Sequence, residues 1–178
     1  VEQCEGLEDR IPAINKGPKV TAETDKAGIA AAARIIKGML DAPDFRNHVD
    51  QASYHPQLDY ISMPAVDSFE DGELGWFPVA FHELVHSTGH HSRLNRFGKK
   101  DTQRFGDADY SKEELIAEMG SAYLSGEASL SRSDARLDNS AAYIAGWIKS
   151  CRKDPGLLVS AAGKAQKAAD YILGTTKA

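Results

Sequence analysis

Apolar residues recur at the spacing of an α-helix in several segments of the chain. Across residues 21–40 they predict a helix that Thr21 or Thr24 can cap and that Pro43 ends. A second helix is predicted from about Trp76 to Thr88, where Gly89 is the stop signal. The buried face predicted for the first helix consists of Ile29, Ala33, Ile36 and Leu40.

The C-terminal half of the chain repeats this helical pattern. One helix is predicted to begin at Ser111, another near Asn139, and a last one after Asp154. The apolar stripe of the last helix consists of Leu158, Ala161, Ala165, Ala169 and Ile172.

Residues 45–63 have a different character. Their aromatic and branched residues, with a break near Pro56, predict a small antiparallel sheet. Residues 67–75 are an acidic turn around Gly72, residues 92–110 a long polar loop, and residues 1–19 an extended arm with at most one short strand. The pattern therefore predicts an α+β fold that is mostly helical, with one small antiparallel sheet.

Composition narrows the class of protein. A chain of 178 residues suits a single domain, 1–178. Its net charge of -5 argues against binding of nucleic-acid phosphates by this chain. Cys4 and Cys151 are too few for a disulfide scaffold, which favours a reduced, cytoplasmic setting. No apolar run approaches the roughly 20 residues that span a bilayer, so no membrane partner is expected. Because the chain begins at Val1 and not at Met, we expect a fragment that lacks some N-terminal part.

The sequence His82-Glu83-Leu84-Val85-His86 is the strongest candidate for chemistry. On a helical wheel, His82 and His86 lie about 40° apart and one turn from each other, while Glu83 lies about 100° from His82. The adjoining face is apolar and predicts the core side of the helix: Phe77, Ala80, Phe81, Leu84 and Val85.

This spacing suits a catalytic zinc ion. Two neutral imidazoles, from His82 and His86, would hold Zn²⁺, a third protein ligand would complete the set, and one position would stay open for water. The metal lowers the pKa of that water toward about 7, and Glu83 would act as the general base that takes its proton. A five-residue match can also arise by chance, but here it lies on a strongly amphipathic helix.

The sequence leaves two glutamates as alternatives for the third metal ligand. A third histidine would be expected six residues after His86, where Ser92 stands, and His90 and His91 have the wrong spacing and are expected at the surface or beside the ligands. The next helix offers Glu114 and Glu118 on one face, whereas Glu113 is expected to point into solvent.

Two arrangements of these glutamates are consistent with the sequence. If Ser111 and Glu114 form a capping box, Glu118 is the ligand. Zincins with a glutamate ligand usually carry a supporting acid or amide four residues later, which favours Glu114 as the ligand and Glu118 as the support of a ligand histidine.

Several separate motifs also carry a family resemblance. They are VEQCEGL (1–7), YHPQLDYISMP (54–64), HELVHSTGHHSRLNR (82–96), YSKEELIAEMGSAYL (110–124), SAAYIAGWI (140–148) and AAGKAQKAADYI (161–172). In this order they resemble the C-terminal metallopeptidase domain of ArdC-type antirestriction proteins, which conjugative plasmids, phages and other mobile elements encode. One departure is Ser87, where many relatives carry an aromatic residue.

The resemblance implies a zincin-like fold with His82, His86 and a glutamate of the EELIAE segment on the metal, and Glu83 as catalytic base. It also implies an N-terminal domain that binds single-stranded DNA, which is absent from this sequence, and a role in protecting incoming DNA from restriction. Single-stranded DNA is therefore expected as a partner only through that absent domain.

The predicted function is a zinc-dependent metallopeptidase that hydrolyses a protein or peptide substrate. Tyr110, Tyr123 and Tyr143 are candidate oxyanion donors, Tyr143 first, although each can equally be a packing residue. Arg93 and Arg96 are expected to have structural roles. The alternative is a non-catalytic module, stabilised by zinc, that serves a DNA-binding antirestriction protein; the intact Glu83 favours the enzyme.

Overall fold

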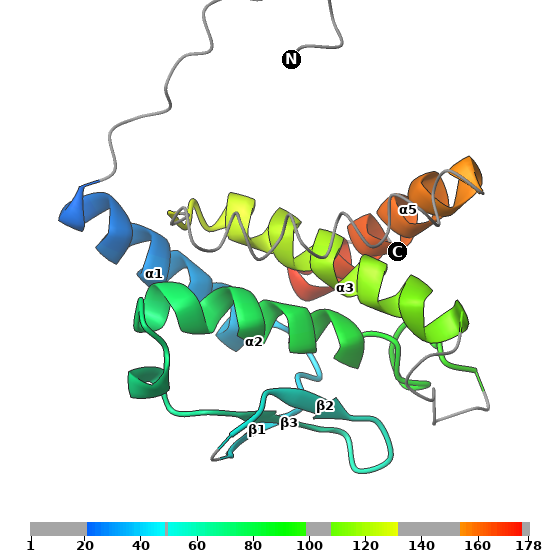
Figure 1. Cartoon of the computed structure of the whole chain (residues 1–178), viewed down its shortest axis with the longest axis horizontal. Coiled ribbons are helices and arrows are strands. Elements are labelled where there is room, and N and C mark those ends of the chain that lie inside the picture. The colour runs from blue at the N-terminus through cyan, green and yellow to red at the C-terminus, as the bar shows by residue number, and fades with distance from the viewer. Residues whose placement is uncertain (1–20, 49, 99–107, 132–153, 176–178) are drawn as a thin grey trace, which may run out of the picture.

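The computed structural model describes residues 21–48, 50–98, 108–131 and 154–175. Figure 1 shows helix α2 in the middle of the molecule, with the sheet on one side and helix α3 on the other. The predicted arm at 1–19, the predicted helix near Asn139 and both cysteines lie outside the described residues. No helix in the described ranges has the length and apolar character needed to cross a membrane.

Helix α1 (Ala22–Gly38) begins at Thr21, whose hydroxyl accepts from the Thr24 amide in a capping box. The predicted face is confirmed at Ile29 and Ile36, which pack against the core, but it is wrong at Ala33, which is exposed, and at Leu40, which lies beyond the helix with 75% of its surface exposed. The fully buried positions are Gly28 and Ala32. The reason is a close approach: a Cβ at position 28 would lie 3.0 Å from the carbonyl oxygen of Ser129. The absence of a side chain at Gly28 therefore allows α1 to approach this carbonyl closely.

The sheet contains three strands: β1 (Asp44–Asn47), β2 (Ser53–His55) and β3 (Tyr60–Met63). Their order is β1-β3-β2, with β1 parallel and β2 antiparallel to β3. The prediction of a wholly antiparallel sheet was therefore wrong. The chain reverses direction after β1 and again at the β2–β3 turn, where Asp59 has a positive φ of 48°, so β3 runs parallel to β1 and lies between the other two strands.

Helix α2 (Glu73–Ser87) begins three residues before the prediction, directly after Gly72, whose positive φ of 55° suits glycine. The predicted core residues on this helix are confirmed, since all of them are buried: Phe77, Ala80, Phe81, Leu84 and Val85. Their face carries the centre of the hydrophobic core, and the neighbouring face is left for polar side chains.

Helix α3 (Ala108–Glu127) lies very close to α2. A Cβ at Gly120 would lie only 2.7 Å from a methyl carbon of Val85, so the absence of a side chain there allows the approach. The Ser121 hydroxyl also donates to the Pro78 carbonyl at 2.6 Å. These contacts fix the distance between the two helices that carry the predicted metal ligands.

Helix α5 (Pro155–Ile172) packs mainly on α3 and begins at Asp154, whose carboxylate accepts from the Gly156 amide. The predicted stripe is confirmed at Ala161, Ala165, Ala169 and Ile172, and Ala168 joins it. Leu158 was predicted wrongly, since 46% of its surface is exposed in the first turn of the helix.

Candidate metal centre

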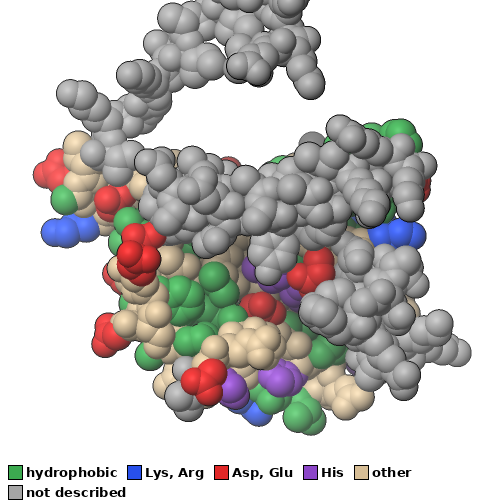
Figure 2. Space-filling model, viewed as in Figure 1, with side chains coloured by type: hydrophobic (Ala, Val, Ile, Leu, Met, Phe, Trp, Pro, Cys, Tyr) green, Lys and Arg blue, Asp and Glu red, His purple; other side chains and the backbone are tan. Residues whose placement is uncertain are grey.

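The centre of the candidate site is the pair of histidines on α2. His82 and His86 stand one turn apart, and their Nε2 atoms lie 3.0 Å from each other. Both side chains are mostly buried. Figure 2 shows histidine and acidic side chains gathered near the middle of this face of the molecule. The helix alone therefore brings two metal-binding nitrogens to one point, as its sequence predicts.

Helix α3 contributes Glu114 to the same point. One carboxylate oxygen lies 3.6 Å from Nε2 of His82, and the other lies 3.3 Å from Nε2 of His86. The alternative in which Glu114 and Ser111 form a capping box is contradicted, because α3 begins at Ala108 and Ser111 lies inside the helix.

The outer ring nitrogens of the two histidines face two further glutamates of α3. Nδ1 of His82 lies 3.5 Å from Glu118, and Nδ1 of His86 lies 3.4 Å from Glu113. Each imidazole therefore has its Nε2 atom directed at Glu114 and its Nδ1 atom directed at a second carboxylate. Such an outer carboxylate typically orients a ligand histidine in metalloproteins.

The expectation that Glu113 points into solvent was wrong. This side chain is almost fully buried and lies between His86 and Arg96, which donates to both of its oxygens. Local spacing on the helix did not reveal this, because Arg96 lies 17 positions earlier in the sequence. Arg96 and Glu113 are the two residues that the sequence analysis did not place at the site.

The donor set fits a divalent metal ion. Among the described residues, the ligand atoms of His82, His86 and Glu114 all lie within 4.8 Å of one another. Ligands at about 2.0–2.1 Å from a tetrahedral zinc ion stand roughly 3.3 Å apart. The two Nε2 atoms lie 3.0 Å apart, and His86 and His82 lie 3.3 Å and 3.6 Å from different oxygens of the Glu114 carboxylate, so the three groups are close to that spacing. Two imidazoles and one carboxylate are also a common protein ligand set for catalytic zinc.

When no metal is bound, the ionised glutamates at this point pair with a protonated His86. Burial lowers the pKa of His86, but hydrogen bonds to Glu113 and Glu114 outweigh it and raise the pKa to about 10. Burial raises the pKa of Glu114, but hydrogen bonds with His82 and His86 outweigh it and hold the pKa below its usual value. Burial also raises the pKa of Glu113, but hydrogen bonds with His86 and Arg96 outweigh it and hold that pKa below its usual value. The carboxylates therefore stay ionised and ready to bind a cation.

Glu83 lies on the sheet side of the histidines. Only 8% of its surface is exposed, and its Oε2 atom accepts a hydrogen bond of 2.7 Å from the Tyr54 amide on β2. The helical wheel places Glu83 away from the apolar face of α2, but the sheet covers it. Glu83 therefore also contributes to the fold, because this bond connects α2 to an edge strand.

The turn after α2 is held by two arginines, and both have the structural contacts that the sequence predicts. Arg93 forms a bidentate ion pair with Asp59 and donates to the Asp41 carbonyl. Arg96 pairs with Glu113 and donates to the Val85 carbonyl at the end of α2. Gly89 makes this turn possible, since a Cβ there would lie 2.5 Å from the Phe97 ring.

The remaining candidates that the structure describes are the two histidines of the turn and Tyr123. His90 bonds to Ser92 in the turn, and His91 is exposed, as expected for histidines that are not ligands. Tyr123 packs against the hydrophobic core. Tyr143 and the side chain of Tyr110 lie outside the part of the chain that the structure describes. Ser87 is buried and donates to the Leu84 carbonyl.

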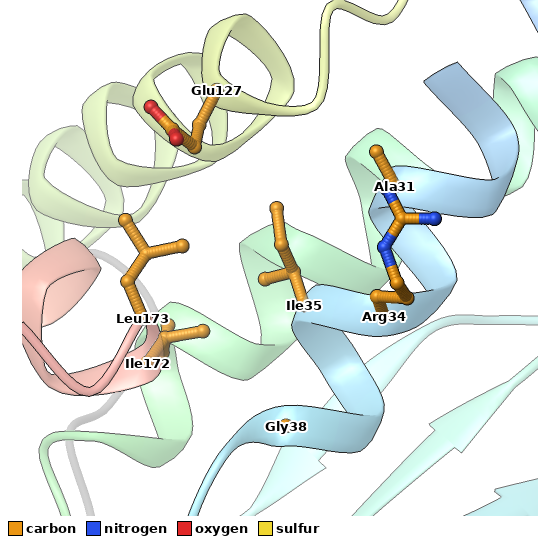
Figure 3. Close-up of a pocket in the computed structure, with 7 residues that line it drawn as sticks. All are labelled: Ala31, Arg34, Ile35, Gly38, Glu127, Ile172 and Leu173. Carbon is orange, nitrogen blue, oxygen red and sulfur yellow. The ribbon is translucent and has the colours of Figure 1, made fainter. Parts of the chain in front are cut away.

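A pocket of about 310 Å³ lies elsewhere, between α1, the end of α3 and the end of α5. Figure 3 shows Arg34 on one side of it and Glu127 on the other, with Ile35 between them and Leu173 below Glu127. None of the histidines or glutamates of the metal centre lines this pocket.

A helix with an HExxH sequence, a carboxylate from the next helix and a buried glutamate beside them define the zincin class of metallopeptidase sites. The chain belongs to the zincin-like metallopeptidase family, whose model matches residues 31–164. The fold expected from the resemblance is thus confirmed.

Solved structures confirm the predicted resemblance to ArdC. The Mn(II)-bound crystal structure of the antirestriction protein ArdC from the R388 plasmid matches 87% of this chain with a TM-score of 0.61 and 35% identity. The metal-free structure of that protein matches with a TM-score of 0.59 and 33% identity. The chain spans 52% and 60% of those two chains.

Curated relatives are longer still. The chain is 37% identical over 124 residues to a DNA primase TraC of Escherichia coli, of which it spans 11%. It is also 37% identical over 129 residues to the uncharacterised protein y4eC of Sinorhizobium fredii, of which it spans 40%. The same domain thus occurs inside proteins of different length and name.

Proposed function

We propose that this chain is a zinc-dependent peptidase domain of a mobile-element antirestriction protein. One observation carries the proposal: the ligand atoms of His82, His86 and Glu114 lie close together beside α2, the helix that also carries Glu83. Similarity to ArdC of the R388 plasmid supports the antirestriction setting.

In this proposal His82, His86 and Glu114 are the metal ligands, and Glu118 supports His82 from outside. The ligand set favours zinc, and the Mn(II)-bound form of ArdC supports a divalent ion in general. Bound there, the ion would polarise a peptide carbonyl and lower the pKa of a water molecule.

Glu83 is the general base in this mechanism. The Tyr54 amide holds its Oε2 atom, so we assign proton transfer to Oε1. Oε1 would take a proton from the attacking water and return it to the nitrogen of the leaving amine. The hydrogen bond from a backbone amide fixes the direction of the carboxylate, which suits a group that must act in one geometry.

The substrate is proposed to be a protein or peptide. Single-stranded DNA would be bound by a separate domain of the longer protein, because this chain carries a net charge of -5. A zinc-stabilised, non-catalytic module remains the competing function, and the following experiment separates the two.

The test compares wild type with Glu83→Gln, each loaded with zinc, on a peptide library and on host restriction subunits. We expect both proteins to hold about one zinc per chain, and Glu83→Gln to lose peptide hydrolysis by roughly 10²–10⁴-fold, the usual size of general-base catalysis. Glu73→Gln removes an exposed charge from the first turn of the same helix and is the matched control.

Three results would count against the enzyme. A wild type that takes up no metal would remove the basis of the site. Equal hydrolysis by wild type and Glu83→Gln would exclude Glu83 as base. Equal protection of DNA in cells by zinc-loaded wild type and by Glu83→Gln would favour the non-catalytic module.

A further inference from the structure

The carboxylates that contact the Nδ1 atoms of the two histidines differ in their exposure to solvent. Glu118, next to His82, has 36% of its side chain exposed, whereas Glu113, next to His86, has 7% exposed. Solvent can compete with the contact between Glu118 and His82. It has little access to the contact between Glu113 and His86, so the two ligands of one metal centre are constrained to different degrees.

Glu113 is itself held by a buried cation. Arg96 donates through Nε to one of its oxygens at 3.1 Å and through Nη2 to the other. The same guanidinium donates to the Thr88 hydroxyl at 2.6 Å and to the Val85 carbonyl at 2.8 Å. Arg96 therefore clamps Glu113 to the C-terminal turn of α2, the turn that also carries His86.

We propose that Arg96 and Glu113 are positioning residues that fix His86 as a metal ligand before the metal arrives. This inference rests on the proposed metal site and adds the pair that prepares it. Neither side chain touches the metal-binding point, since Glu113 faces Nδ1 of His86 and Arg96 lies beyond Glu113.

The physical basis is the direction of the imidazole. An ionised Glu113 accepts a hydrogen bond from Nδ1 of His86, so Nε2 is the nitrogen that faces the metal-binding point and gives up its proton when a metal ion binds. A bidentate pair restrains the carboxylate in both position and plane, as a single contact would not. Without the pair, the ring would lose its hydrogen-bond partner and would have to be ordered when the metal binds.

The turn offers a matched control. Arg93 lies three residues before Arg96 and forms a similar bidentate pair with Asp59, whose side chain is 33% exposed, but that pair touches neither ligand histidine. Glu113→Gln and Asp59→Asn both leave an arginine without its charge partner while preserving the size of the side chain. Both are expected to lower thermal stability. Only Glu113→Gln is expected to change the metal site.

The experiment measures zinc affinity by competition with a chromophoric chelator, and the visible spectrum of the Co²⁺-substituted protein. We expect Glu113→Gln and Arg96→Ala to weaken zinc binding by about 10–100-fold, the usual effect of losing an outer partner of a ligand histidine. Arg96→Lys should recover part of this loss, because an ammonium can pair with Glu113 but cannot make the bidentate contact. The Co²⁺ spectrum should change in the Glu113 and Arg96 variants.

Asp59→Asn and Arg93→Lys should bind zinc as wild type does and keep its Co²⁺ spectrum. Glu118→Gln should show a smaller loss of affinity than Glu113→Gln, because Glu118 is the more exposed support.

The inference fails if wild type binds zinc and Glu113→Gln binds it equally well with an unchanged Co²⁺ spectrum. It also fails if Asp59→Asn weakens zinc binding as much as Glu113→Gln does, since the effect would then be general destabilisation. If wild type itself binds no zinc, the proposed function fails instead. Should Arg96→Ala not fold, the comparison between Glu113→Gln and Arg96→Lys still decides the matter.

Discussion

Helix α3 makes two interfaces of opposite character. Toward α2 it presents Glu113, Glu114 and Glu118 to two histidines, in a contact tight enough to require Gly120. Against α5 it meets a helix whose buried residues are four alanines and Ile172. The buried face of α5 is thus made of small apolar residues and one isoleucine.

The difference between the two interfaces shows where the polar residues of the candidate metal centre constrain helix packing. Buried carboxylates and imidazoles are stable only when each polar atom has a partner, so the α2–α3 interface tolerates few substitutions. The apolar face of α5 should tolerate changes that conserve shape and volume. Substitutions on the two sides of α3 should therefore have different consequences, and four experiments test this.

The largest effect is expected from the ligands themselves. His86→Ala should abolish stoichiometric zinc binding, and Glu114→Ala should weaken it more than Glu118→Ala, whose loss should stay within about 10–100-fold. Because a bound metal stabilises the folded state by about 2.7 kcal/mol at a concentration of 100 Kd, wild type should melt higher with zinc and His86→Ala should not. Zinc titration monitored by calorimetry and by thermal melting measures both effects. The reverse order for the two glutamates would make Glu118 the ligand.

The second effect concerns the distance between α2 and α3. Gly120→Ala adds a methyl group 2.7 Å from Val85, and overpacking of this kind typically costs about 1–3 kcal/mol. Zinc affinity should fall as well, since Glu114 moves with its helix. Gly126→Ala on the same helix meets nothing within 4 Å and should be neutral or slightly stabilising. Urea unfolding and zinc competition on both variants provide the comparison, and equal behaviour of the two would show that the close approach is unimportant.

The third effect is a dependence on pH that only the α2–α3 interface should show. In the metal-free protein the pKa of His86 is raised from 6.5 to about 10, so its pairing with Glu113 and Glu114 is fully stabilising below pH 6.5 and is lost as the pH rises through about 10. The two glutamates have lowered pKa values and contribute above pH 4.5, so their contribution is lost only as the pH falls further. Metal-free stability should therefore decline between pH 6.5 and 10.

Zinc binding should have the opposite slope, because the metal displaces protons from its ligands and its affinity rises with pH. Urea unfolding between pH 6.5 and 10, with chelator and with zinc, tests both statements. Parallel slopes in the two conditions would contradict the proton-for-metal exchange. His86→Ala in chelator is the control and should lose most of the decline.

The smallest effect is expected in α5. A Cβ added at Gly163 would meet no other atom within 4 Å, so Gly163→Ala should stabilise the protein by about 0.5–1 kcal/mol through helix propensity. Zinc affinity should be unchanged. A change in zinc affinity would show that the α3–α5 interface is coupled to the metal centre after all.

The part of the site that sequence predicts well is the part that lies on one helix. The five apolar positions of α2, its two histidines and Glu83 follow from the 3.6-residue period and from a motif with known chemistry. The same period placed Glu114 and Glu118 together on α3. Such predictions succeed because neighbours along a helix are also neighbours in space.

The errors concern contacts between distant segments. The burial of Glu113 depends on Arg96 in another element, and the parallel pairing of β1 with β3 depends on two chain reversals. Leu40 and Leu158 match the helical period, but they lie beyond or at the end of their helices, where the neighbouring elements do not cover them. No local pattern encodes which surface another segment will cover.

A mechanical consequence follows from the fact that Glu113, Glu114 and Glu118, the three carboxylates that contact the two histidines, all belong to α3. A slide of that helix by a single residue, about 1.5 Å along its axis with a turn of about 100°, would replace every carboxylate at once. The helix therefore behaves as one rigid part whose axial register sets the whole acidic half of the centre. A ligand or partner domain that shifted α3 by a fraction of this step would change the affinity of the centre for a cation. It would not itself need to contact a metal-binding residue.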